Sequence, residues 1–208
     1  DYKDSVKLKN YLMMKTNQLL TEKELIDKKI DLRYFAILLA LQTGIRFGEI
    51  VGLTKEDFDF VNETLSINKI WDDASKMEQG FSETKNREHR KLKVGKKTLS
   101  IFKELFKHVI ENENNLVFYE PSSIYKVISN SGTNDLLRLI LKKLGLREIS
   151  IHGLRHTHVS VLIYHNISIL YIAERLGHSS IETTYKHYSH MIKELKKEDE
   201  KKTVKIFD

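Results

Sequence analysis

The sequence predicts a mainly helical α+β fold with a small antiparallel β-sheet, on three observations. Proline, which interrupts helices, occurs only once in 208 residues, at Pro121. Apolar residues recur at helical spacing over most of the chain. Between about Asp59 and Val94 the pattern changes to the alternation of polar and apolar residues that is typical of strands, in "DFDFVNETLSINKIW" and "RKLKV", with "NET" as a turn.

The helices are expected as follows. Thr21 and Glu24 form a capping-box pattern and predict a helix that begins at Thr21. The apolar segment "DLRYFAILLALQTG" predicts a buried helix that ends at Gly44, and "RFGEIVGL" starts a short helix after this break. Ser168 is the expected N-cap of a helix that ends at Gly177. Further helices are predicted over residues 98–113, 133–145, 154–166 and 180–202, and a short strand over 203–207.

Composition limits the possible classes of protein. Hydrophobic residues make up 40% of the chain, enough for the core of one substantial domain, and the net charge of +6 weakly favours an anionic partner. The absence of cysteine excludes disulfides, thiol nucleophiles and cysteine zinc sites. The chain has no apolar run of about 18 residues and no signal-peptide pattern, so we expect an intracellular protein with no membrane segment. The first residue is not Met, which suggests a domain of a longer protein.

The segment "ISIHGLRHTHVS" is rich in histidine and permits several interpretations. On a helix, His152 and Arg155 share a face because they are three residues apart. A metal site would need His152 and His156, with a third ligand from His158 or His178. We disfavour a metal because Arg155 would repel a cation and no carboxylate lies nearby in the sequence. Histidines that only pack or face solvent are the remaining alternative.

Two other segments indicate an anion site. Arg46 follows the break at Gly44 and begins a helix, where the N-terminal amides and a guanidinium together favour an anion. His178 follows Gly177, and Tyr188 comes ten residues after His178.

The segments "LQTGIRFGEIVGL", "SIHGLRHTHVSVLI" and "IAERLGHSSIETTYKHYSHM" resemble the tyrosine recombinases, in particular the branch of phage and transposon integrases. The resemblance covers Leu20 to Met191. It implies the fold of the tyrosine recombinase catalytic domain, a DNA breaking-rejoining enzyme. It also implies three parts: residues 1–19 as the linker from a missing N-terminal core-binding domain, 20–191 as the catalytic domain, and 192–208 as a C-terminal tail for protomer exchange.

The resemblance assigns roles to individual residues. Its first arginine falls on Arg46, its histidine and second arginine on His152 and Arg155, its later histidine on His178, and its nucleophile on Tyr188. In the roles it implies, Arg46, Arg155 and His178 bind the DNA phosphate and His152 is the general base. Tyr185 competes for the role of nucleophile but lacks the Ser–His that follows Tyr188.

The remaining assignments concern supporting residues. The family's hairpin lysine, which donates a proton to the leaving 5′ oxygen, is assigned to Lys85, while Lys91 and Lys93 are the less favoured positions. Glu49 is expected to orient Arg46 from three residues away. His156 and His158 are expected to be bystanders that pack or face solvent.

The function that this resemblance implies is site-specific recombination. A phage-type or conjugative-transposon integrase cleaves and rejoins DNA through a 3′-phosphotyrosine, without metal or cofactor, and so integrates or excises a mobile element. The implied partners are double-stranded attachment-site DNA, a homotetramer on that DNA, an excisionase and a host DNA-bending protein, all in the bacterial cytoplasm. Two alternatives are a non-catalytic helix-turn-helix-like DNA-binding regulator and a type IB topoisomerase-like relaxing enzyme.

Overall fold

A computed structural model describes residues 2–21, 30–72, 80–84, 89–186, 188–189, 200, 203–204 and 206. The helices are α1 (Tyr2–Thr21), α2 (Leu32–Thr43), α3 (Phe47–Val51), a 3₁₀ turn (Lys55–Asp57), α4 (Lys96–Leu105), α5 (Asn130–Lys143), α6 (Ile151–Tyr164) and α7 (Ile169–Leu176). The strands are β1 (Phe58–Asp59), β2 (Thr64–Ile67), β3 (Ile70–Asp72), β4 (Gly80–Ser82) and β5 (Arg90–Lys93). Mainly helical structure with small antiparallel sheets confirms the predicted fold class.

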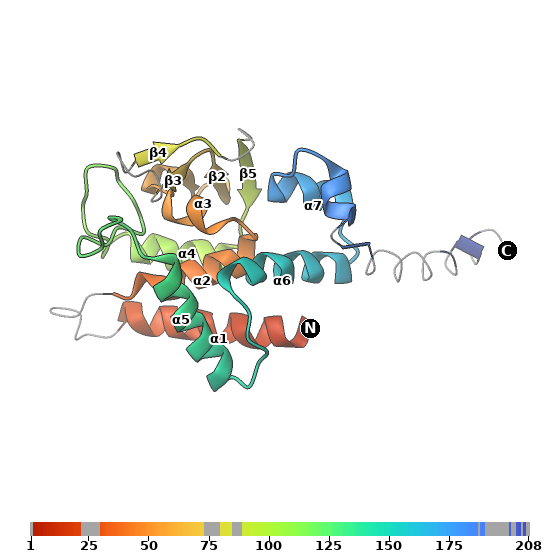
Figure 1. Ribbon diagram of the computed structural model, residues 1–208, viewed down its shortest axis with the longest axis horizontal. Helices are drawn as coiled ribbons and strands as arrows, with labels where there is room; N and C mark the ends of the chain where they lie inside the picture. Colours follow the sequence, from red (N-terminus) through yellow and green to blue (C-terminus); the bar gives the residue numbers. More distant parts are fainter. Residues whose placement is uncertain are drawn as a thin grey trace.

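Helix α2 is the centre of the main core. It packs against α1, α5 and α6, which surround it in Figure 1. The Asp31 side chain begins the helix by accepting a hydrogen bond from the backbone N–H of Arg33, and Gly44 ends it in the left-handed conformation, with φ of 69°. Left-handed backbone favours glycine because glycine has no Cβ. The predicted end of this helix is therefore confirmed.

The strands form two sheets rather than the single sheet expected between Asp59 and Val94. One sheet has the order β1-β2-β5 and the other pairs β3 with β4, all antiparallel. In β5 the side chain of Leu92 is buried in the core, opposite Leu65 of β2. Arg90 is two residues earlier, on the same face as Leu92, and is paired with Ile67. This alternation directs Arg90 inward.

The N-terminal segment differs from the prediction. Thr21 ends α1 rather than beginning a helix, and its hydroxyl donates to the carbonyl of Asn17 in the turn before it. Within residues 1–19, expected to be a linker, Leu8 and Leu12 are buried in the main core. These residues are thus packed as part of the fold. The division of the chain into domains stays a prediction.

The helix predicted over 98–113 is shorter than expected, because α4 ends at Leu105. The side chain of Asn112 both accepts from and donates to the backbone of Leu116, a local pairing that competes with helix formation. The predicted C-terminal strand is also wrong in the described positions, since Thr203, Val204 and Ile206 are helical. None of the helices in the described part of the chain combines the length and apolar character that spanning a bilayer requires.

A second, smaller core lies beside the main one. It consists of five buried side chains from α6, α7 and the helical residues 181–186 and 188–189. They are Val159, Ile163, Ile172, Leu176 and Tyr188. The C-terminal half of α6 thereby connects the main core to the segment that carries Tyr188.

Candidate active site

Arg155 is the buried centre of the candidate site. It lies in α6, which the Ser150 side chain caps by accepting from the N–H of Gly153. Its guanidinium donates to the carbonyl of Gly44 at the end of α2 and to the carbonyl of Leu176 at the end of α7, both at 2.8 Å. Carbonyls at helix C-termini lack helical partners and carry partial negative charge, so they stabilise a cation. Three distant segments are fixed around one guanidinium.

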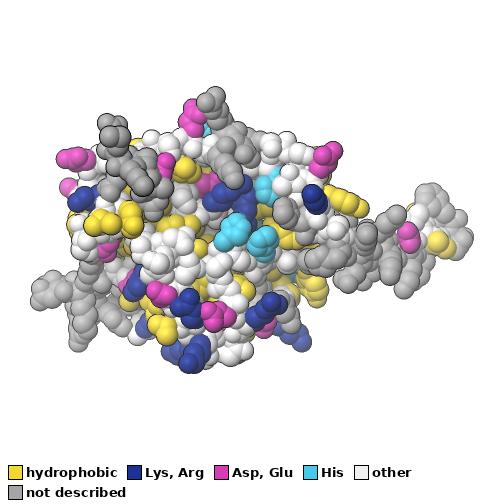
Figure 2. Space-filling model, in the orientation of Figure 1, with side chains coloured by type: hydrophobic (Ala, Val, Ile, Leu, Met, Phe, Trp, Pro, Cys, Tyr) yellow, Lys and Arg dark blue, Asp and Glu magenta, His cyan; other side chains and the backbone are white. Residues whose placement is uncertain are grey.

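Arg46 and Arg155 act on each other electrostatically. Burial, the largest cause, and the positive charge of Arg46 lower the pKa of Arg155 to about 10, while the charge of Glu49 opposes the shift. Arg46 therefore lies within electrostatic range of Arg155, and the joint role of the two arginines stays a prediction. Figure 2 shows histidine side chains near the middle of one face, beside Lys or Arg side chains. A guanidinium whose charge is destabilised by burial and by a neighbouring positive charge makes a site that an anion would stabilise.

Glu49 holds Arg46 at the start of α3 and is 1% exposed. Its carboxylate accepts from the backbone N–H of Arg46 at 2.8 Å and from the Arg46 guanidinium at 3.5 Å. Arg90 from β5 donates to both carboxylate oxygens, at 3.0 and 2.9 Å. Burial raises the pKa of Glu49, but the hydrogen bonds and charges of Arg90 and Arg46 outweigh burial and lower it overall. Glu49 is thus an ionised link between two arginines.

His178 lies directly against Arg155. The Arg155 guanidinium and His178 Nε2 are 3.0 Å apart, and His178 Nδ1 and the Thr184 hydroxyl are 2.7 Å apart. Because a guanidinium can only donate, Nε2 accepts from Arg155, and the proton of a neutral ring lies on Nδ1, which donates to Thr184. His178 and Arg155 therefore form one hydrogen-bonded unit.

Tyr188 packs over α6 with its side chain 6% exposed. Its hydroxyl lies 2.7 Å from Nδ1 of His156. Burial raises the pKa of Tyr188, and the positive charge of Arg155 lowers it. The expectation that His156 is a bystander is therefore wrong, because His156 is the hydrogen-bond partner of the predicted nucleophile. Tyr185, the competing tyrosine, is half exposed.

His152 lies one turn before His156 on the exposed side of α6, and the two rings meet edge to face with centroids 5.2 Å apart. Burial lowers the pKa of His152, and the charges of Arg155 and Arg46 lower it further. His152 therefore shares the environment of the two arginines and is disposed to be neutral at pH 7.

His158 packs inside the protein, which is one of the two alternatives expected for it, the other being a position that faces solvent. Its Nδ1 lies 3.0 Å from the carbonyl of Leu41, and its Nε2 accepts from Arg175 at 3.1 Å. Burial and the charge of Arg175 lower the pKa of His158 to about 3, so the ring is neutral. Arg175 also donates to the carbonyl of Gln42, which ties α7 to the end of α2.

Lys85, the predicted catalytic lysine, lies outside the described residues. Lys91 and Lys93, the less favoured positions, are exposed on β5, and Lys93 donates to the carbonyl of Asn62. No group of three or more His, Asp or Glu side chains in the described segments could hold a metal ion.

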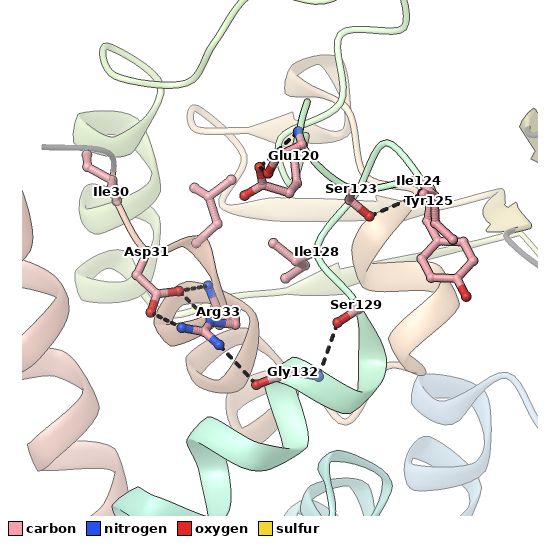
Figure 3. Close-up of a pocket in the computed structure, with 12 residues that line it drawn as sticks. Ile30, Asp31, Arg33, Glu120, Ser123, Ile124, Tyr125, Ile128, Ser129 and Gly132 are labelled. Atoms are coloured by element: carbon pink, nitrogen blue, oxygen red, sulfur yellow. Dashed lines mark hydrogen bonds and ion pairs between the residues drawn. The ribbon is translucent and has the colours of Figure 1, made fainter.

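A separate cavity of about 600 Å³ lies between the N-terminal ends of α2 and α5 and the loop that precedes α5 (Figure 3). Arg33 lines it, paired with Asp31 and donating to the carbonyl of Gly132. None of the predicted site residues lines this cavity.

Arg90, Arg175 and Thr184 complete the site without having been predicted from the sequence. Arg90 had a detectable pattern, because strand alternation places it on the face of buried Leu92. Arg175 and Thr184 showed no such pattern in the sequence. Only tertiary packing brings Arg175 of α7 to His158, and Thr184 to His178.

Comparisons with known proteins identify relatives of this chain. Relatives include the integrase of Staphylococcus phage L54a, 27% identical over 98% of this chain, and the ICEBs1 integrase of Bacillus subtilis, 29% identical over 77% of it. The chain spans 62% and 45% of the length of these two relatives.

Solved structures show the same fold. The Tn1549 transposon integrase in complex with a circular intermediate DNA superposes with a TM-score of 0.65 and 21% identity, over 83% of this chain and 58% of that one. The XerA recombinase superposes with a TM-score of 0.66 and 20% identity, over 96% of this chain and 64% of that one. The sequence model of the phage integrase family matches residues 13–194. The resemblance inferred from the sequence is therefore confirmed, and the chain belongs to the phage integrase family.

Proposed function

We propose that this domain cleaves and rejoins DNA as a site-specific recombinase, with Tyr188 as the nucleophile. The observation that carries the proposal is the position of the Tyr188 hydroxyl, which lies against His156 of α6. In this position the charge of Arg155 affects the pKa of Tyr188, and the charge of Arg46 affects the pKa of Arg155. A phenol, two guanidiniums and imidazoles around one site suit phosphoryl transfer.

The proposed reaction is an in-line displacement at a DNA phosphorus. The Tyr188 oxygen forms a bond to phosphorus, the bond from phosphorus to the 5′ oxygen breaks, and a 3′-phosphotyrosine and a free 5′ hydroxyl result. Arg46 and Arg155 would bind the non-bridging oxygens, whose negative charge grows in the transition state. Lys85 would give the leaving 5′ oxygen its proton. Attack by a 5′ hydroxyl on the phosphotyrosine reverses the step and rejoins the strand.

The histidines would complete the phosphate site. His152 lies with the two arginines, and neutral imidazole there would hydrogen-bond the phosphate or accept a proton. His178 would donate to a phosphate oxygen. Its Nε2 accepts from Arg155 in the structure, so donation requires either a second proton on His178, or a shift of Arg155 toward the phosphate together with the ring tautomer that carries its proton on Nε2. Glu49 would keep Arg46 in place through its hydrogen bonds to the Arg46 backbone N–H and guanidinium.

The wider role follows from the relatives, which are named as integrases, transposases and recombinases. We propose that the protein integrates or excises a mobile element at double-stranded attachment sites in the bacterial cytoplasm. Four protomers on two duplexes would supply the four strand cleavages of a full exchange, with an excisionase and a host DNA-bending protein as further partners. Neither a non-catalytic regulator nor a type IB topoisomerase-like enzyme is favoured by these names.

The test is capture of the covalent intermediate. The protein is incubated with a library of nicked duplexes that contain a randomised segment, and adducts that survive denaturation are recovered by gel and sequenced. We expect a 3′-linked adduct at Tyr188 and its complete loss in Tyr188→Phe, because this variant lacks the hydroxyl that lies against His156.

Tyr185→Phe is the matched control, since Tyr185 is three residues away and exposed. It should form adduct at the wild-type rate. Adduct formation by Tyr188→Phe, or no adduct with wild-type protein on any sequence, would contradict the proposed function.

A further inference from the structure

The proton of the Tyr188 hydroxyl has an identifiable acceptor in this structure. We propose that His156, rather than His152, takes this proton during DNA cleavage, which makes His156 a catalytic residue. The inference rests on the proposed function and concerns one step of it.

The geometry is that of a preformed proton-transfer pair. His156 Nδ1 and the Tyr188 oxygen are 2.7 Å apart, within the reach that general base catalysis requires. The ring centroids are 5.8 Å apart and the planes are tilted by 49°. His156 lies next to Arg155 in α6, so the base is fixed on the same helix as the guanidinium that would bind the phosphate.

The environment of Tyr188 creates the need for a base. The side chain is 6% exposed and packs against Val159 and Ile163, so water has little access to it. Burial also favours the neutral phenol by raising its pKa. The charge of Arg155 lowers this pKa, but its effect is smaller than that of burial. A buried phenol that stays protonated is a poor nucleophile unless an adjacent group removes its proton as the bond to phosphorus forms.

The step balances with the groups present. The O–H bond of Tyr188 breaks and its proton goes to Nδ1 of His156, while the phenolic oxygen bonds to phosphorus and the 5′ oxygen leaves and is protonated by an acid. His156 becomes an imidazolium beside the negatively charged phosphotyrosine. In the rejoining step the phosphotyrosine bond breaks, and the same imidazolium returns the proton to the phenolate.

His152 would have a different role. Its ring meets the edge or face of His156 at a centroid distance of 5.2 Å, one turn earlier on α6. This places it to orient the His156 ring and to face the phosphate. The two histidines are therefore separable by substitution.

The experiment measures single-turnover cleavage of a duplex selected from the adduct library. The variants are His156→Asn and His156→Ala in the full chain. The Asn side chain places an oxygen near the position of Nδ1, so it can accept the Tyr188 hydrogen bond but is not basic enough to take the proton. We expect both variants to bind the duplex like wild type and to cleave it roughly 10²–10⁴-fold more slowly. Added imidazole should partly restore the rate of His156→Ala only.

His108→Asn is the matched control, because His108 is a histidine near Glu104 on the surface and far from the site in the fold. It should cleave at the wild-type rate. Wild-type cleavage by His156→Asn would overturn the proposal in favour of a positioning role, and wild-type cleavage by His156→Ala would remove any role. Either result would leave the proposed function intact, because wild-type protein would still form its adduct.

Discussion

At the scale of single residues, the site depends on charges that are buried but compensated. Glu49 is almost fully buried and accepts four hydrogen bonds from Arg46 and Arg90. Removing one member of such a group leaves the others buried and unpaired, which costs more than the group contributes as a whole. Glu49 is therefore expected to matter for stability as well as for the position of Arg46.

Glu49→Gln should lower the free energy of unfolding by about 3–5 kcal/mol near pH 7. The folded-state pKa of Glu49 lies below its ordinary value. Its stabilising charge is therefore fully present above the unfolded pKa of about 4.3 and is lost as the pH falls through the folded pKa. Urea unfolding of both proteins between pH 3 and pH 7 should show the difference shrinking toward the acid end.

Glu104→Gln serves as the surface control, since Glu104 pairs with Lys107 on an exposed face. It should leave the unfolding free energy near pH 7 unchanged. A difference between wild type and Glu49→Gln that stays constant down to pH 3 would contradict the ionised, arginine-paired state of Glu49.

At the scale of elements, arginines fill the C-terminal ends of two helices. Arg155 and Arg175 donate to carbonyls at the end of α2, and Arg155 and Arg90 donate to carbonyls in the last turn of α7. The end of α2 is closely packed as well: a Cβ on Gly44 would lie 2.7 Å from Cδ2 of His158. His158 cannot move away easily because both of its ring nitrogens are hydrogen-bonded.

Gly44→Ala and Gly145→Ala form a matched pair that tests this packing. Both glycines have positive φ, 69° and 63°, but nothing lies within 4 Å of a Cβ on Gly145. Gly145→Ala should cost about 1–2 kcal/mol for the backbone alone. Gly44→Ala should cost about 1–3 kcal/mol more, because it overpacks against His158. Thermal and urea unfolding measure the two losses in the free energy of unfolding. Equal losses in the two variants would show that the His158 side chain moves to make room for the added Cβ.

At the scale of the whole molecule, Tyr188, the proposed nucleophile, belongs to a different core from Ile45, the residue next to Arg46. Tyr188 packs in the small core of α6, α7 and residues 181–189, whereas α2, α5 and the sheet residues share the main core. A small core with few buried contacts opens more readily than a large one. Arg46, which is proposed to bind phosphate, and Tyr188 should therefore differ in local stability.

Hydrogen exchange followed by mass spectrometry should reveal this difference. Peptides that cover residues 178–189 are expected to exchange at least tenfold faster than peptides from α2, because their opening requires only the small core to separate. Binding of a cleavable duplex should slow exchange in 178–189 more than in α1, which serves as the internal reference. Equal exchange in α2 and in 178–189 would mean that the two cores unfold as one unit.

Much of the fold was predictable from local patterns, whereas the roles of the site residues were inferred from the family resemblance and stay predictions. The apolar segment before Gly44, the helix that carries His152 and Arg155, and the helix that ends at Gly177 all depend on residues within a few positions of one another. Capping and periodicity act over this range, which is why they can be recognised in one sequence. The division of the strands into two sheets could not be predicted, because pairing depends on contacts between distant segments.

By itself the sequence determined several of the helices, the order of the site residues along the chain and the chemistry that these residue types can perform. Only the tertiary structure decided which histidine meets Tyr188, that Arg90 and Glu49 pair, and that Leu8 and Leu12 pack in the main core. The physical reason is range. A cap or a helical face is fixed by neighbours in the chain, whereas the partner of a side chain is fixed by packing between segments more than thirty residues apart, as His156 and Tyr188 are.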